Sequence, residues 1–235
     1  MAPRGPSPWA TVDFEAGTVT PVATDLHVVW SCFLHAASAL LQATIRASGA
    51  VLTQRVTFGS LLHCKERFSL KYHTERAHDP RRAGNSPFHH YDDTQSRLAY
   101  FYFFVPRHAR ALSQALGLAG RPLSQAVLAA WAQDRPFSVT SVGGGPGADL
   151  LGLLLYIHDT PALAQYKGGP KRVRVCTLDL PDWGAIWPAL QAAVGAYFPD
   201  VFVEFHAADC TAVASAALVP AGTDLVIFCN FLVEM

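Results

Sequence analysis

Charged residues are scarce in this sequence. Asp, Glu, Lys and Arg make up 15% of the 235 residues, against about 25% in ordinary soluble domains. Hydrophobic residues make up 51%, which is ample for a buried core and excludes a wholly disordered chain. The net charge is zero but unevenly spread, with +5 over residues 1–136 and −5 over residues 137–235. Such a split indicates two parts with different roles.

Paired cysteines are also lacking. The sequence has five cysteines, an odd number, and no two of them have CxxC spacing. Cys176 and Cys229 lie inside apolar runs, as buried thiols do. We therefore expect reduced cysteines and an intracellular protein, in the nucleus, the nucleolus or the cytoplasm. His63, Cys64 and His73 match no standard zinc spacing, so no metal is expected.

An uninterrupted apolar run long enough for a membrane is missing as well. Residues 1–8 contain no apolar segment of the kind found in signal peptides. Residues 26–43 form the most apolar early stretch, but His, Ser and Gln interrupt it. A core helix is therefore predicted there, and no membrane contact.

Residues 1–136 predict a mainly helical extension. Residues 1–24 are expected to be irregular, residues 51–72 fit either a helix or a strand, and residues 76–91 predict a loop. Helices are expected at 26–47, from Asp92 or Asp93 to a break at Pro106, from there to a stop at Gly117, and from Pro122 to Trp131.

Residues 137–235 show a different pattern, in which strands alternate with helices. Strands are expected at 137–142, 172–180, 201–205 and 224–229, and helices at 149–158, 183–197 and 211–218. This alternation predicts an α/β fold, a Rossmann-like parallel sheet with right-handed crossovers and helices on both faces. The domain boundary is therefore predicted between residues 136 and 137.

A glycine-rich segment, Ser141–Asp149, follows the first predicted strand and opens a helix. Glycines there allow a tight turn and close approach of a ligand to the backbone. Gly143, Gly145 and Ala148 satisfy the GxGxxA form of dinucleotide-binding loops. The GxGPG form, with Pro146, instead resembles motif I of the class I S-adenosylmethionine-dependent methyltransferases. A glycine-rich turn without a ligand is the third alternative.

The resemblance assigns cofactor contacts to the loop and to three later residues: Gly143, Gly144, Gly145, Pro146, Gly147, Asp179, Trp183 and Asp209. In this family an acid such as Asp179 ends the second strand and binds the ribose hydroxyls. Asp179 lies 32 residues beyond Gly147, where about 20 is usual, so residues 167–170 are predicted to be an insertion.

The remaining assignments each have a structural alternative. Trp183 would stack on adenine or line the pocket, but it could equally belong to the core. Asp209 would face the adenine amino group, or it could cap the helix predicted at 211–218. Asn230 follows the fourth strand and is the candidate on the substrate side. No catalytic residue stands out.

The resemblance implies methyl transfer from S-adenosylmethionine. Residues 178–183 and the loop also loosely resemble fungal uridine-N3 methyltransferases of large-subunit rRNA, and this likeness makes RNA a candidate methyl acceptor. A non-catalytic binding or scaffold protein and an NAD(P)-dependent oxidoreductase remain alternatives. The family sheet has seven strands in the order 3-2-1-4-5-7-6, whereas four are predicted here, so the fold is expected to be incomplete at the C-terminus. We expect a partner, the N-terminal region or a missing segment to cover the fourth strand.

Overall fold

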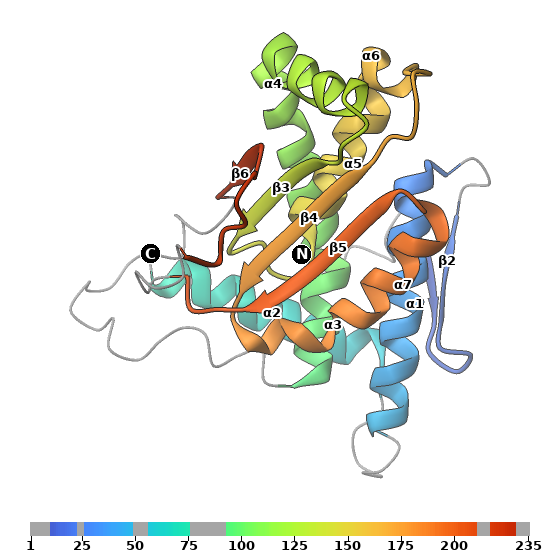
Figure 1. Ribbon diagram of the computed structural model, residues 1–235. Coiled ribbons are helices and arrows are strands. Elements are labelled where there is room, and N and C mark those ends of the chain that lie inside the picture. The colour runs from blue at the N-terminus through green and yellow to red at the C-terminus, as the bar shows by residue number, and fades with distance from the viewer. Residues whose placement is uncertain (1–9, 23–25, 49–55, 76–92, 211–216, 229–235) are drawn as a thin grey trace. The chain divides into compact units, whose positions relative to one another are not determined.

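A computed structural model describes residues 10–22, 26–48, 56–75, 93–210 and 217–228 (Figure 1). The chain forms two compact units, Met1–Phe104 and Val105–Met235. Helix α4 (Val105–Ala132) begins the second unit and packs against its helix α5 (Ala148–Asp159). The second unit therefore includes residues 105–136, which precede its first strand.

The first unit starts with a hairpin where an irregular arm was expected. Strands β1 (Ala10–Asp13) and β2 (Thr18–Pro21) pair antiparallel. The turn between them is held by Asp13, whose Oδ1 accepts hydrogen bonds from the N–H groups of Glu15 and Ala16, each at 2.9 Å. The expectation of an irregular segment was wrong for these residues, because Val and Thr alternate on both sides of this turn and favour strands.

Three helices complete the described part of the first unit: α1 (Val28–Ser48), α2 (Phe58–Glu75) and α3 (Thr94–Phe103). The helix expected at 26–47 is confirmed. The ambiguous segment at 51–72 is helical from Phe58 on, and its first five residues lie outside the described ones. Asp93 caps α3 as expected, since its Oδ1 accepts a hydrogen bond from Ser96 N–H at 2.7 Å. Helix α1 packs on β2 and α3. The loop expected at 76–91 lies outside the described residues.

One stretch of α1, Val28–Ala47, is long and apolar enough to cross a membrane by length and composition. In the part of the chain that the structure describes, no other helix meets this test. A buried core helix meets the same test, so length and composition alone do not separate the two.

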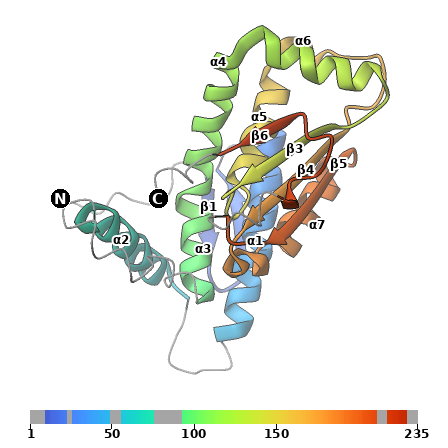
Figure 2. The same ribbon diagram turned by 60° about the vertical axis from the view of Figure 1, so that its left-hand side comes forward.

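Helix α4 bends sharply within its length (Figure 2). The break after Phe104 is the one expected from Pro106, since a helix tends to end before the residue that precedes a proline. The stop expected at Gly117 was wrong, because the backbone leaves helical geometry at Gly120, with φ 64° and ψ −139°. Gly120 lies two residues before Pro122. The part of α4 that follows Gly120 ends near Trp131, as predicted.

The described part of the second unit holds a parallel sheet of four strands, in the order β5-β4-β3-β6 (Figure 1). The strands are β3 (Phe137–Val142), β4 (Val173–Asp179), β5 (Val201–Ala207) and β6 (Leu225–Ile227). All neighbouring pairs are parallel. The predicted fold class, an α/β Rossmann-like sheet in a chain that also has a helical N-terminal region, is confirmed.

The two faces of the sheet differ, because successive side chains of a strand point to opposite sides. We call the first face the one that carries Ser141, Thr177 and Phe205, which are register partners across β3, β4 and β5. Helix α5 lies against this face through Ser141, and helix α7 (Trp187–Tyr197) through Phe205. The second face carries the alternate residues. The helix expected at 211–218 lies mostly outside the described residues.

Candidate functional site

The glycine loop lies where the strand order reverses. From β3 the chain proceeds to β4 and β5 on one side, and it then returns to β6 on the other side of β3. In open α/β sheets ligands bind at such a switch point, in the crevice beyond the carboxyl ends of the strands. The segment between β3 and α5 is therefore placed where a ligand would be expected on topology alone.

Three glycines of this loop have left-handed backbone conformations. The φ angles are 69° at Gly143, 54° at Gly145 and 90° at Gly147. Side chains other than glycine adopt such angles only with strain. Gly144 needs to be small for another reason, since a Cβ there would overlap Ser141 Oγ. The four glycines of G-G-G-P-G thus suit the path of the backbone.

A buried hydrogen bond closes the base of the loop. Ser141 Oγ donates to Asp149 Oδ2 at 2.6 Å, and both residues are almost fully buried. Asp149 lies in the first turn of α5, where the helix dipole favours a negative charge. Sequence reasoning missed this pair. The available signal was a hydroxyl and a carboxylate at the two ends of the same loop.

Asp179 ends β4 beside the glycine loop. Its Oδ2 accepts a hydrogen bond from Gly145 N–H at 2.5 Å, and its Oδ1 accepts one from Leu180 N–H at 2.6 Å. Burial raises the pKa of Asp179 to about 6, although these two N–H groups oppose the shift and nearby Asp182 adds to it. The carboxylate therefore titrates close to neutral pH.

Gly145 also faces Trp183. A Cβ built on Gly145 would lie 3.8 Å from Trp183 Nε1 and 3.9 Å from Asp179 Oδ2. The structure thus brings together the predicted residues Gly145, Asp179 and Trp183. Trp183 itself is buried in the short 3-10 helix η3 (Pro181–Ala185), which precedes α7. The missing side chain of Gly145 leaves the loop backbone facing both a carboxylate and an indole ring.

The chain that follows β5 crosses the end of β4. Ala208 N–H donates to the Asp179 carbonyl at 2.7 Å, and the Cys210 thiol lies 3.3 Å from the Leu178 carbonyl. Asp209 lies between these contacts and is exposed. The structure therefore places Asp209 near the candidate site, while its proposed contact with adenine stays a prediction. Asn230 lies outside the described residues.

Four of the five cysteines and the predicted insertion lie among the described residues. Cys32, Cys64, Cys176 and Cys210 are free thiols, and Cys229 lies outside the described residues. Between α5 and β4 the structure adds a short helix, α6 (Pro161–Ala164), which was not predicted. This helix and the irregular segment at 167–170 account for the long spacing between the loop and Asp179.

The sequence was compared with family models, curated proteins and solved structures. No family model matches the sequence, and no curated protein matches it. Among solved structures the chain is similar to an O-methyltransferase family protein from Burkholderia thailandensis, with 17% identity and a TM-score of 0.32. The match covers 73% of this chain and 50% of that one, so this chain spans about half the length of the protein it matches.

Proposed function

We propose that this chain binds S-adenosylmethionine at the glycine loop and transfers its methyl group. The observation that carries the proposal is the juxtaposition of Gly145, Asp179 and Trp183 at the switch point of the sheet. A backbone without a side chain, a carboxylate and an indole ring suit an amino-acid nucleoside, which presents hydroxyls and a flat base.

The residues around Gly145 fit this cofactor. Each oxygen of Asp179 accepts one backbone N–H and keeps a further lone pair for a hydroxyl. A Cβ at Gly145 would point at the carboxylate and the indole, so the absence of a side chain opens this approach. The loop backbone at Gly145 would lie against the cofactor, Asp179 would bind the ribose, and Trp183 would contact the base.

When bound, S-adenosylmethionine supplies a methyl group already activated on a sulfonium sulfur. The protein then has to hold donor and acceptor in line and to exclude water, which can contribute several kcal/mol to the lowering of the barrier. The glycine loop and Asp179 supply the orientation. We assign no general base. His206 lies on the second face of the sheet, with its Nε2 3.7 Å from Glu204 Oε2.

Ribosomal RNA is the acceptor that we propose to test first. Two features support this choice: the likeness of residues 178–183 and the loop to uridine-N3 methyltransferases, and the positive charge of residues 1–136. A basic region favours contact with phosphates. Proteins and small molecules are the other acceptor classes in the test.

The test is transfer of a labelled methyl group from S-adenosylmethionine to purified rRNA, to protein extract and to a small-molecule pool. We expect label in the rRNA fraction, and its loss in Asp179→Ala. Asp200→Ala is the matched control, because this exposed aspartate immediately precedes β5 at the opposite end of the sheet. Cofactor binding without transfer to any fraction would favour the alternative of a non-catalytic binding protein.

A further inference from the structure

The second face of the sheet carries a cluster of three side chains that the proposed function does not use. Cys176 on β4 and Glu204 on β5 are register partners, so their side chains lie next to each other on this face. His206 lies two residues beyond Glu204 and therefore on the same face. Ligand atoms of all three residues lie within 4.8 Å of one another.

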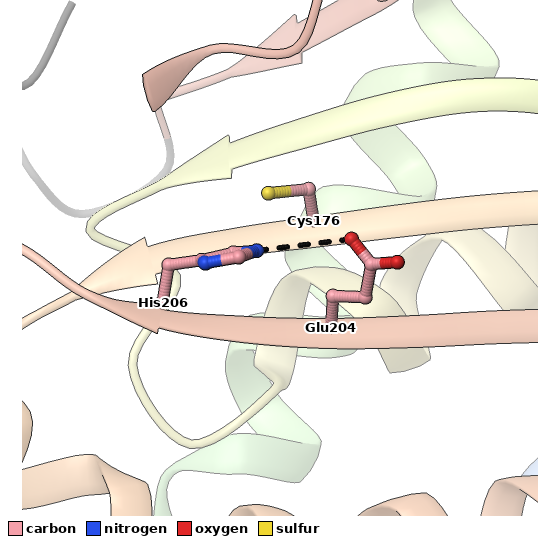
Figure 3. Close-up of side chains that lie close together, drawn as sticks. All are labelled: Cys176, Glu204 and His206. Carbon is pink, nitrogen blue, oxygen red and sulfur yellow. Dashed lines mark ion pairs between the residues drawn. The ribbon is translucent and has the colours of Figure 1, made fainter. Parts of the chain in front are cut away.

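Figure 3 shows how the cluster is arranged. The imidazole of His206 and the carboxylate of Glu204 approach each other from β5, and the Cys176 sulfur extends from β4 beside them. The His206 Nε2 to Glu204 Oε2 distance is 3.7 Å. Ligands of a tetrahedral zinc ion lie about 3.5 Å apart, given metal–ligand bonds of about 2.0–2.3 Å. Because the three atoms lie within 4.8 Å of one another, they would need to close by up to about 1.3 Å, which side-chain rotation can supply.

We propose that Cys176, Glu204 and His206 form a binding site for a thiophilic divalent cation, with zinc as the best match. The set of donors selects the metal. Sulfur and imidazole nitrogen suit zinc, whereas magnesium and calcium prefer oxygen ligands alone. Binding replaces the thiol proton, which leaves to solvent, so that a thiolate, a carboxylate and a neutral imidazole surround the ion.

Arg174 holds the carboxylate in place. Its Nη2 contacts Glu204 Oε1 at 3.1 Å and Oε2 at 3.0 Å. A carboxylate has enough lone pairs to accept from arginine and still bind a metal, and ligating carboxylates are commonly fixed by a further hydrogen bond. We therefore assign Arg174 the role of a positioning residue.

The cluster is buried at the sulfur and open to solvent at the other two ligands. Cys176 is 1% exposed. Burial, and then the charge of Glu204, raise the pKa of its thiol, with Arg174 opposing. On the solvent side Glu204 is partly exposed and His206 is exposed, with side-chain exposures of 42% and 52%. An ion would thus enter from solvent, with an apolar cluster that includes Val142 and Leu178 beside the sulfur, and it would keep a fourth position for water.

Cobalt is the probe for this site, because Co²⁺ bound by a thiolate absorbs in the near ultraviolet and the visible. The full-length chain, fully reduced, is titrated with Co²⁺ and then with Zn²⁺. We expect a thiolate band that saturates at one equivalent and disappears as zinc displaces cobalt. Cys176→Ala should abolish the band, and His206→Ala should weaken cobalt binding at least about tenfold.

Cys210→Ala is the matched control, since Cys210 belongs to the same apolar cluster but not to the triad. It should leave affinity and band unchanged. His206→Ala decides the matter if Cys176→Ala does not fold, because His206 is exposed. A full-length chain without a thiolate band, or a band that survives both triad variants, overturns the proposal. None of these outcomes depends on S-adenosylmethionine.

Discussion

At the scale of single residues, Asp179 meets two opposing demands. It must be buried to lie behind the glycine loop, and it must be ionised to accept hydrogen bonds from the loop and from a ligand. Burial outweighs the two N–H donors, and the pKa of Asp179 is about 6. The folded chain therefore binds this proton more tightly than the unfolded chain, in which the pKa is 3.8. Protonation of Asp179 thus adds to the free energy of unfolding. This contribution is complete below pH 3.8 and is lost as the pH rises through about 6.

Cofactor binding should have the opposite dependence on pH, because a ribose hydroxyl donates to the carboxylate form. We expect the affinity for S-adenosylhomocysteine to fall as the pH is lowered through about 6, by up to about tenfold per pH unit. Calorimetric titration between pH 5 and pH 8 measures it. Asp179→Asn should bind weakly and without this dependence. An unchanged profile in the variant would show that another group titrates.

The loop glycines should not tolerate a side chain. In Gly147→Ala the new Cβ would overlap Leu190 Cδ2 at a backbone φ of 90°. The combined overpacking and strain should cost about 2–4 kcal/mol of unfolding free energy. Gly195→Ala is the control, since Gly195 is exposed within α7 and has no neighbour within 4 Å. That variant should gain about 0.5–1 kcal/mol. Equal effects in urea denaturation would contradict the described loop geometry.

How far the sequence could predict the site depends on the kind of residue. The proximity of Gly145 and Asp179 could be predicted, because a strand, a turn and a further strand end have local signatures, while their contact with a cofactor stays a prediction. The Ser141–Asp149 pair was missed, because its hydrogen bond depends on how α5 turns back beside β3. The cluster around Cys176 needed the register of β4 and β5, which sequence pattern does not supply.

At the scale of elements, the start of β6 is held to the sheet by hydrogen bonds to Asp224, the residue that precedes it. Arg135 donates two hydrogen bonds to Asp224, at 2.7 and 3.0 Å. Asp224 Oδ2 also accepts from Ser138 N–H at 2.9 Å. Burial alone would raise the pKa of Asp224, but these hydrogen bonds together lower it. These hydrogen bonds hold the start of the short β6 in its register against β3.

Asp224→Asn should cost about 1–2 kcal/mol at neutral pH, since it removes a charge-assisted bidentate contact. The pKa of Asp224 is depressed below 3.8, so this stability is present above that value and is lost as the pH falls below it. Thermal unfolding at pH 7 and pH 3 tests both points. Asp134→Asn, at a more exposed ion pair with Arg172, should cost under about 1 kcal/mol. A loss at Asp224 that persists unchanged at pH 3 would contradict this account.

Element prediction succeeded where the local pattern and the tertiary structure agree. Strand β3 has the predicted bounds, because its run of Val, Thr and Ser is closed by glycines. The hairpin β1–β2 was missed since its strands are only four residues each. The bend of α4 was placed at Gly117 rather than Gly120, because sequence alone could not choose between two glycines in one helix.

At the scale of the whole molecule, two compact units share one chain. The proposed cofactor site lies entirely within the second unit, Val105–Met235. We therefore expect two transitions in scanning calorimetry. S-adenosylhomocysteine at one hundred times its dissociation constant should stabilise the second unit by about 2.7 kcal/mol. A shift confined to the other transition would place the site in Met1–Phe104 and contradict the assignment.

The measurement that tests the central claim most directly is calorimetric titration of the full-length chain with S-adenosylhomocysteine, with NADH as the competing cofactor class. We predict a micromolar dissociation constant, about −8 kcal/mol, no binding of NADH, and at least about tenfold weaker binding in Asp179→Ala, where a charged hydrogen-bond acceptor is lost. Asp200→Ala should bind like the unmodified chain. A folded chain that binds NADH instead, or that binds neither ligand, would contradict the assignment of the glycine loop to S-adenosylmethionine.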